Sequence, residues 1–124
     1  MKKKIVLAVS ILVVIVIGIY LYIPMAVTAK MAENATYDVP NYVTMRNEAY
    51  PAKLINGKGM SNSHPVSLEE NNIVFGDFNN DGVTDARVTL DVDISYKDEP
   101  PGSDIVKLEY VVTGRHHVVK TYSS

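Results

Sequence analysis

The strict alternation of apolar and polar residues from Ala86 to Tyr96 constrains the fold of this chain more than any other feature. Apolar residues occupy every even position of these eleven residues, and Arg, Thr, Asp, Asp and Ser occupy the odd positions between them. Side chains of a β-strand point alternately to the two faces of its sheet, so this period of two predicts one buried face and one solvated face. We therefore expect a long, half-buried strand.

A second alternating segment follows after a short loop. The loop, residues 98–104, contains two adjacent prolines, which cannot donate hydrogen bonds to a sheet. The apolar positions that alternate after it are Val106, Leu108, Tyr110 and Val112. The two segments predict an antiparallel hairpin with a shared apolar face. We expect Gly114 to end the second strand and residues 117–122 to add a final one.

Shorter β-type signals occupy the region upstream of this hairpin. Asn56-Gly57 is typical of a two-residue hairpin turn. No helical periodicity and no internal repeat are visible after residue 40. The sequence predicts a mainly β fold, with an antiparallel β-rich domain over residues 41–124. The short candidate strands are Tyr42–Thr44, Pro51–Ile55, Val66–Leu68 and Ile73–Phe75.

The amino-terminal region has a different character. Residues 5–23 are apolar except for a serine, a glycine and two tyrosines, and three lysines at positions 2–4 precede them. A helix of this length spans roughly 28 Å at ~1.5 Å per residue, close to the hydrocarbon thickness of a bilayer. The lysine cluster predicts a cytoplasmic amino terminus, with the rest of the chain outside. The expected partner of residues 5–23 is therefore a lipid bilayer.

Two interpretations of this segment stay open. One is an uncleaved signal anchor. The other is a signal peptide cut after Ala29, where Val27-Thr28-Ala29 offers small residues at the usual positions. In either case we expect three parts: an anchor or signal peptide over residues 1–29, a polar stalk over 30–40, and the extracytoplasmic domain over 41–124.

The amino-acid composition excludes several classes of functional site and partner. The chain has no cysteine, so disulfides, zinc-thiolate sites and thiol nucleophiles are excluded. From residue 30 onward there are 9 basic and 14 acidic residues, a net charge of about −5, which does not suit nucleic acid. A small extracellular domain without disulfides needs another source of stability, and a bound metal is a common one.

The sequence D-F-N-N-D-G-V-T-D, residues 77–85, predicts such a metal site. It places oxygen-bearing side chains at Asp77, Asn79, Asp81 and Asp85, and Gly82 permits the sharp turn that would bring them together. Calcium takes six to eight oxygen ligands and suits this set. The backbone carbonyl of Val83 would supply a fifth protein oxygen, and water would complete the shell.

The spacing of these ligands differs from that of an EF-hand. The first three ligand positions and the glycine match, but the twelfth position is Val88 where an EF-hand has a bidentate glutamate. The following segment is also predicted as a strand and not a helix. The loop is therefore not an EF-hand.

Residues 75–86, F-G-D-F-N-N-D-G-V-T-D-A, resemble the calcium loop of FG-GAP and VCBS repeats, which has the form D-x-[DN]-x-D-G-x-x-D between two strands. A looser resemblance, covering about half the chain, is to small secreted bacterial proteins of uncharacterised function in which such a loop precedes a long strand. The resemblance to FG-GAP and VCBS loops implies bound calcium. Repeats of the first kind build propellers, and one copy cannot form a propeller, so the adhesive roles of those propellers are not implied. A metal-free turn is the alternative, since Asp, Asn and Gly are ordinary turn residues.

Candidate catalytic residues are few. Asp91 and Asp93 share one strand face, and the imidazoles are His64 and the adjacent His116 and His117, which a strand would point to opposite faces. We expect an extracytoplasmic, calcium-stabilised β-domain that binds an unknown protein or envelope partner or has a structural role, without enzymatic activity. The alternative is a small enzyme or enzyme inhibitor whose site the sequence does not reveal.

Overall fold

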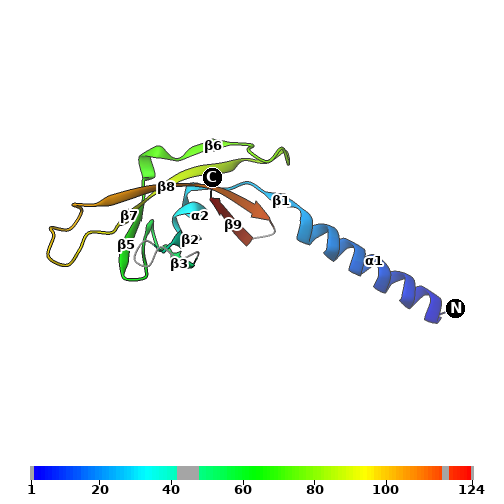
Figure 1. The fold of residues 1–124 in the computed structure, drawn as a ribbon. Coiled ribbons are helices and arrows are strands. Elements are labelled where there is room, and N and C mark those ends of the chain that lie inside the picture. Colours follow the sequence, from blue (N-terminus) through cyan, green and yellow to red (C-terminus); the bar gives the residue numbers. More distant parts are fainter. Residues whose placement is uncertain (1, 42–47, 116–117, 124) are drawn as a thin grey trace.

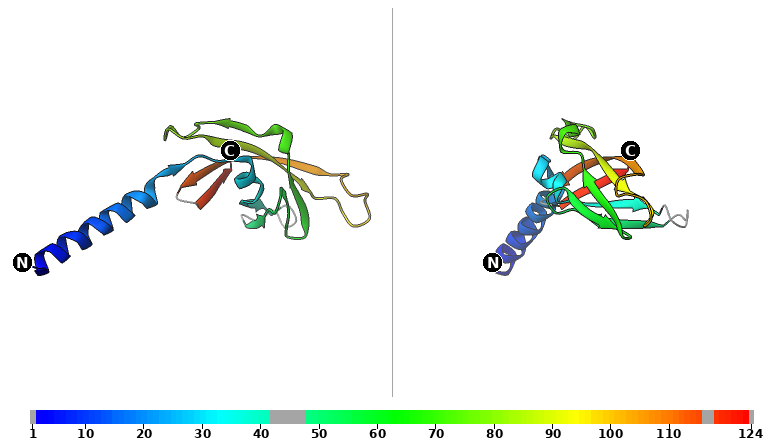
Figure 2. Two further views of the ribbon diagram at one scale, coloured as in Figure 1. Left: turned by 180° about the vertical axis from the view of Figure 1, so that it is seen from behind. Right: turned by 90° about the vertical axis from the view of Figure 1, so that its left-hand side faces the viewer.

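The computed structural model describes residues 2–41, 48–115 and 118–123, with the backbone alone over 18–22 and at 118. A helix, α1 (Lys2–Tyr22), projects from one end of a β-rich body (Figure 1). Views from behind and from the side show the same arrangement, with the helix outside the body throughout its length (Figure 2).

Antiparallel strands make up most of the body, which confirms the predicted mainly β fold. The elements after α1 are β1 (Pro24–Met25), α2 (Ala29–Glu33), β2 (Thr36–Pro40), β3 (Ala49–Lys53), β4 (Lys58–Ser61), β5 (His64–Leu68), the 3-10 turn η1 (Glu70–Asn72), β6 (Val74–Gly76), β7 (Asp85–Asp93), β8 (Ile105–Arg115) and β9 (Val118–Ser123). One seven-stranded sheet has the order β1-β8-β7-β5-β4, with β6 also paired to β7 and β9 also paired to β8, while β2 and β3 form a separate two-stranded sheet.

The predicted long hairpin is formed by β7 and β8, in antiparallel register from Ala86↔Val112 to Asp93↔Ile105. The even-numbered residues of β7 from Ala86 to Val92 are fully buried, as their alternation predicts. The strand ends three residues early, and Tyr96 is 73 % exposed. It ends there because the Asp93 carboxylate accepts hydrogen bonds from the N–H groups of Ser95 and Gly102, which turns the chain into the loop.

The expectation that Gly114 ends the second strand is wrong. β8 continues through Gly114 to Arg115, and β1 pairs with it there, Met25 opposite Gly114. A Cβ on Gly114 would lie 2.7 Å from the carbonyl oxygen of Met25, so the glycine permits the close approach of β1. The predicted final strand is confirmed as β9, which pairs with β8 over residues 118–123.

The predicted Asn56-Gly57 turn is confirmed. Ile55 and Lys58 exchange backbone hydrogen bonds across it, with N···O distances of 2.9 and 3.2 Å, and both central residues have positive φ. Val66–Leu68 and Val74–Phe75 lie in β5 and β6 as expected. Residues 51–53 lie in β3, which pairs with β2. The candidate strand at 42–44 lies outside the described residues.

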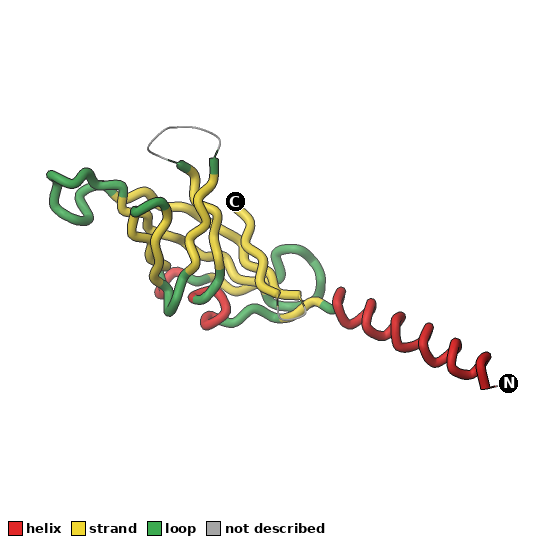
Figure 3. Tube along the Cα trace, turned by 90° about the horizontal axis from the view of Figure 1, so that it is seen from below, coloured by secondary structure: helices red, strands yellow, loops and turns green. Residues whose placement is uncertain are grey.

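The predicted stalk, residues 30–40, is instead part of the folded body. It forms most of α2 and all of β2, and it buries Ala32, Tyr37 and Val39 in the core. The Tyr37 ring packs edge-on against Tyr110 of β8, with ring centroids 5.1 Å apart, and its hydroxyl donates to the carbonyl of Ala32. These contacts fix the segment against the large sheet, and Figure 3 shows short helical segments beside the strands.

The apolar side chains of α1 are exposed. The large ones from Ile5 to Ile17 are each between 49 % and 68 % exposed. Within the described residues, however, no helix combines the length and apolarity needed to cross a membrane. The expectation of a membrane-spanning helix over residues 5–23 is therefore unsupported by the structure.

Candidate metal centre

The acidic loop connects two paired strands. β6 ends at Gly76 and β7 begins at Asp85, and these two residues face each other across the hairpin. Residues 77–84 bulge out from this point. A backbone hydrogen bond from Val27 N–H to the carbonyl of Thr84, 2.8 Å long, ties the end of the loop to the segment that follows β1. The predicted loop therefore does precede the long strand.

Three carboxylates converge inside this loop. One oxygen from each of Asp77, Asp81 and Asp85 lies within 4.8 Å of the others. Oxygens that bind one calcium ion at 2.3–2.6 Å are at most about 5 Å apart, so the spacing fits a shared ion. All three donors are hard oxygens, which is the ligand chemistry that calcium prefers.

Backbone N–H groups hold two of these carboxylates in place. Asp77 accepts from Asp81 at 3.2 Å and from Gly82 at 3.0 Å, and Asp81 accepts from Val83 at 3.1 Å. The Asn79 side-chain oxygen also accepts from the Asp81 N–H, at 3.3 Å. Each carboxylate oxygen has more than one lone pair, so these bonds orient the ligands without preventing them from binding a cation.

Positive backbone φ angles make the tight curl of the loop possible. Gly82 has φ +86°, as its place in the sequence motif predicts, and Asn80 has φ +58°. Glycine and asparagine are the residues that adopt this left-handed conformation at the lowest cost. The sequence therefore supplies permissive residues at both points where the loop turns.

Asp85 is the most buried of the three carboxylates, and one of its oxygens has no hydrogen-bond partner in the described part of the chain. Its side chain is 0 % exposed, its Oδ2 accepts from the Phe78 N–H at 3.0 Å, and its Oδ1 has no hydrogen-bond partner among the described residues. Burial raises the pKa of this carboxyl, and the negative charges of Asp81 and Asp77 raise it further, while the N–H groups of Phe78 and Asn79 act in the opposite direction. A cation bound between the three carboxylates would compensate both the burial and the repulsion.

The structure thus brings together the predicted acidic ligands, with Asn79 and Val83 in the same hydrogen-bonded loop. The other candidates have different surroundings. Asp91 forms an ion pair of 3.1 Å with Lys107, and Asp93 accepts the backbone hydrogen bonds that shape the 94–104 loop, so both carboxylates have a structural role. His64 Nε2 is buried without a partner in the described part of the chain. His116 and His117 lie outside the described residues.

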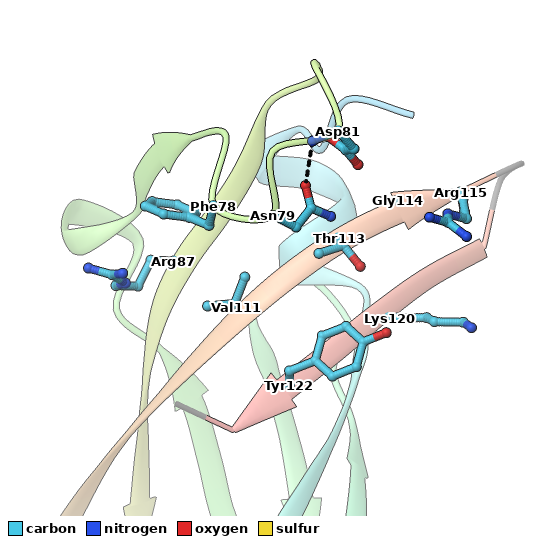
Figure 4. Close-up of a pocket in the computed structure, with 10 residues that line it drawn as sticks. All are labelled: Phe78, Asn79, Asp81, Arg87, Val111, Thr113, Gly114, Arg115, Lys120 and Tyr122. Atoms are coloured by element: carbon cyan, nitrogen blue, oxygen red, sulfur yellow. Dashed lines mark hydrogen bonds between the residues drawn. The ribbon is translucent and has the colours of Figure 1, made fainter. Parts of the chain in front are cut away.

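A groove beside the metal loop was not foreseen from the sequence. It is open, with a volume of about 460 Å³, and side chains from the loop and from β7, β8 and β9 line it (Figure 4). The polar half of the alternating pattern marks Arg87 as outward-facing, but Lys120 lies outside that pattern. That pattern gives no indication that the two side chains share one groove.

Comparisons of the chain with family models, with curated proteins and with solved structures found no match. The resemblance of residues 75–86 to FG-GAP and VCBS loops therefore rests on those residues alone and stays a prediction. The geometry of the loop provides an independent argument for the metal.

Proposed function

We propose that this chain is a calcium-binding β-domain that works outside the cytoplasm, either by binding a partner or as a structural part of the cell envelope, and not by catalysis. The observation that carries the proposal is the buried Asp85 Oδ1, which has no partner in the described structure and lies beside the carboxylates of Asp77 and Asp81. A buried carboxylate oxygen without a partner is costly unless something charged satisfies it.

The residues that would hold the ion are those of the loop itself. Asp77, Asn79, Asp81 and Asp85 would supply side-chain oxygens and Val83 its carbonyl, with water completing the shell. The ion would neutralise three converging negative charges and fix the β6–β7 connection against the segment after β1. Lacking a bidentate glutamate, the site should bind with the modest affinity of extracellular modules, on the order of 0.1–1 mM. That affinity suits a compartment with millimolar calcium.

Isothermal titration of the full-length chain in non-ionic detergent tests this proposal. We expect one saturable calcium-binding event per chain, with a dissociation constant of about 0.1–1 mM. Substitution of Asp81 by Ala should abolish the heat, while substitution of Asp98 by Ala, which removes an equal charge from a distant exposed loop, should leave it unchanged. Absence of binding heat in the unmodified chain would refute the proposal.

The extracytoplasmic location rests on the amino-terminal segment. Three lysines precede an apolar run whose large side chains are exposed from Ile5 to Ile17, and exposed apolar surface of this extent is typical of a segment that contacts lipid or a transport machinery. We propose that residues 5–23 direct the chain to the membrane and stay attached to it.

The structure bears on whether the segment is cut after Ala29. Such a cut would remove β1, which pairs with β8, and Val27, which is 3 % exposed in the core. It would also remove Thr28, whose hydroxyl accepts the Met31 N–H at the start of α2. Loss of these contacts would weaken the fold beside the metal loop, which favours retention of the segment.

Cell fractionation with mass measurement tests this part. We expect the chain in the membrane fraction, resistant to extraction at high salt, with an intact mass that includes residues 5–29. Protease added to spheroplasts should digest the β-rich body. A soluble product whose mass corresponds to a start at residue 30 would refute retention and support the signal peptide.

A further inference from the structure

The groove beside the metal loop gathers positive charge. Arg87 of β7, Arg115 of β8 and Lys120 of β9 all line it, as Figure 4 shows. These are three of the nine basic residues in an otherwise acidic segment that follows residue 29. Asp81 is the acidic residue in the lining, and its charge would be neutralised by a bound calcium ion.

Strand register explains why these side chains lie on the same face of the sheet. Arg87 lies opposite Val111, and Val111 lies opposite Tyr122 on the next strand, so the three form one row across the outer face of the sheet. Thr113 and Lys120 form the next row of the same face, two residues along each strand. Val111 and Thr113 thus form the floor of the groove, and the longer side chains form its sides.

The cations of the groove differ from the well-paired lysine at the other end of β8. Lys107 forms ion pairs with Glu69 at 3.0 Å and with Asp91 at 3.1 Å. Among the described residues, no acidic side chain forms an ion pair with Arg115 or Lys120. In Figure 4 Arg115 and Lys120 lie on one side of the groove, while Arg87 lies on the other side, next to Phe78. Unpaired cations that line one concavity favour a negatively charged occupant.

Two aromatic side chains give the groove its shape. The Arg87 guanidinium lies 4.6 Å from the centroid of the Phe78 ring, a cation–π contact that restricts the orientation of its planar N–H fork. Such a fork binds carboxylate or phosphate oxygens in pairs. The Tyr122 side chain, 53 % exposed, offers an aromatic face and a hydroxyl on the opposite side.

We propose that this groove binds a small anionic ligand whose phosphate or carboxylate group is held by Arg115 and Lys120. Phe78, Asn79 and Asp81 form the wall contributed by the metal loop. Calcium should therefore strengthen anion binding, since it orders that wall and neutralises Asp81. Only this coupling rests on the proposed function, because the three cations line the groove whether or not the metal is bound.

Titration of the full-length chain in non-ionic detergent at low ionic strength tests the proposal. The probes are glycerol phosphate for the phosphate class and glucuronate for the carboxylate class, with glycerol and glucose as uncharged controls. We expect saturable binding of at least one anion and none of either control, and the stronger anion identifies the ligand class. Equal binding of the uncharged compounds, or no binding of either anion, would overturn the proposal.

Charge variants locate the site. Lys120→Gln should weaken binding of the anion by about tenfold, as expected for loss of one charged contact. Lys97→Gln removes a charge from the exposed loop between β7 and β8 and should leave binding unchanged. Equal losses in the two variants would indicate non-specific attraction and contradict a groove site.

Measurement of anion binding with and without calcium tests the groove proposal separately from the metal proposal. Anion affinity is measured in chelator and again in 5 mM calcium, with the calcium titration of the preceding section as reference. Higher affinity in calcium supports the coupling, and equal affinity in a chain that binds calcium overturns it. If the chain binds no calcium but still binds the anion through Lys120, the proposed calcium-binding function is refuted and the anion-binding groove is supported.

Discussion

Calcium at 10 mM is expected to raise the thermal unfolding midpoint of this chain by about 6–20 °C over its value in chelator. At a dissociation constant of about 0.1–1 mM, this concentration stabilises the folded state by roughly 1.4–2.7 kcal/mol. In a domain of this size each kcal/mol shifts the midpoint by about 4–8 °C. Circular dichroism of the β-sheet signal against temperature, at increasing calcium concentrations, gives the measurement.

Variants show whether the shift comes from the proposed centre. Asp81→Asn keeps an oxygen that can accept the Val83 N–H but removes the ligand charge, so it should remove most of the shift. Asp98→Asn changes an exposed loop carboxylate and should show the full shift. An equal shift in both variants would mean that calcium acts elsewhere on the acidic surface.

Local periodicity explains which strands could be predicted. The alternation over residues 86–96 and 106–112 is a property of neighbouring residues, and the short loop between the two segments makes an antiparallel pair the simplest connection. The structure shows that pair as β7 and β8. The Asn56-Gly57 turn was predictable for the same reason, because its backbone conformation depends on the two residues themselves.

Long-range contacts explain why the predictions for Gly114 and for residues 30–40 were wrong. Gly114 is a glycine because the carbonyl of Met25, far away in the sequence, would meet its Cβ at 2.7 Å, and no local pattern indicates such an approach. Residues 30–40 form most of a five-residue helix and all of a five-residue strand, and both elements are too short to show clear periodicity. Their burial depends on Tyr110, which lies on the other side of the core.

The candidate site likewise has features that the sequence predicts and features that depend on long-range contacts. The spacing of Asp77, Asp81 and Asp85 within one loop predicts their convergence, since a tight curl of nine residues brings alternate side chains together. The burial of Asp85 was not predictable, because it depends on how the loop covers the start of β7. The groove depends on the relative register of three strands, which single-sequence patterns do not determine.

Replacement of Asp85 by Asn is expected to stabilise the metal-free chain at neutral pH and to remove its response to calcium. The amide oxygen of Asn can still accept the Phe78 N–H, whereas the buried negative charge, close to two others, is removed. We expect a gain of about 1–3 kcal/mol in the free energy of unfolding in chelator, because a buried unpaired charge costs more than a buried neutral amide of the same size. Urea denaturation in chelator and in calcium measures both effects.

The pH dependence of this gain identifies its cause. Because burial raises the Asp85 pKa, the folded metal-free chain holds this proton more tightly than the unfolded chain does. The favourable contribution of the protonated carboxyl is full below the unfolded pKa of about 3.9 and is lost as the pH rises through the higher folded pKa. The advantage of Asp85→Asn should therefore be small at the acid end of this range and reach its full size above the folded pKa. The difference between the pH profiles of the two proteins therefore reports the effect of the Asp85 charge. A metal-free variant less stable than the unmodified chain at pH 7 would show that the ionised carboxylate has another favourable partner and would remove the main argument for a cation at this position.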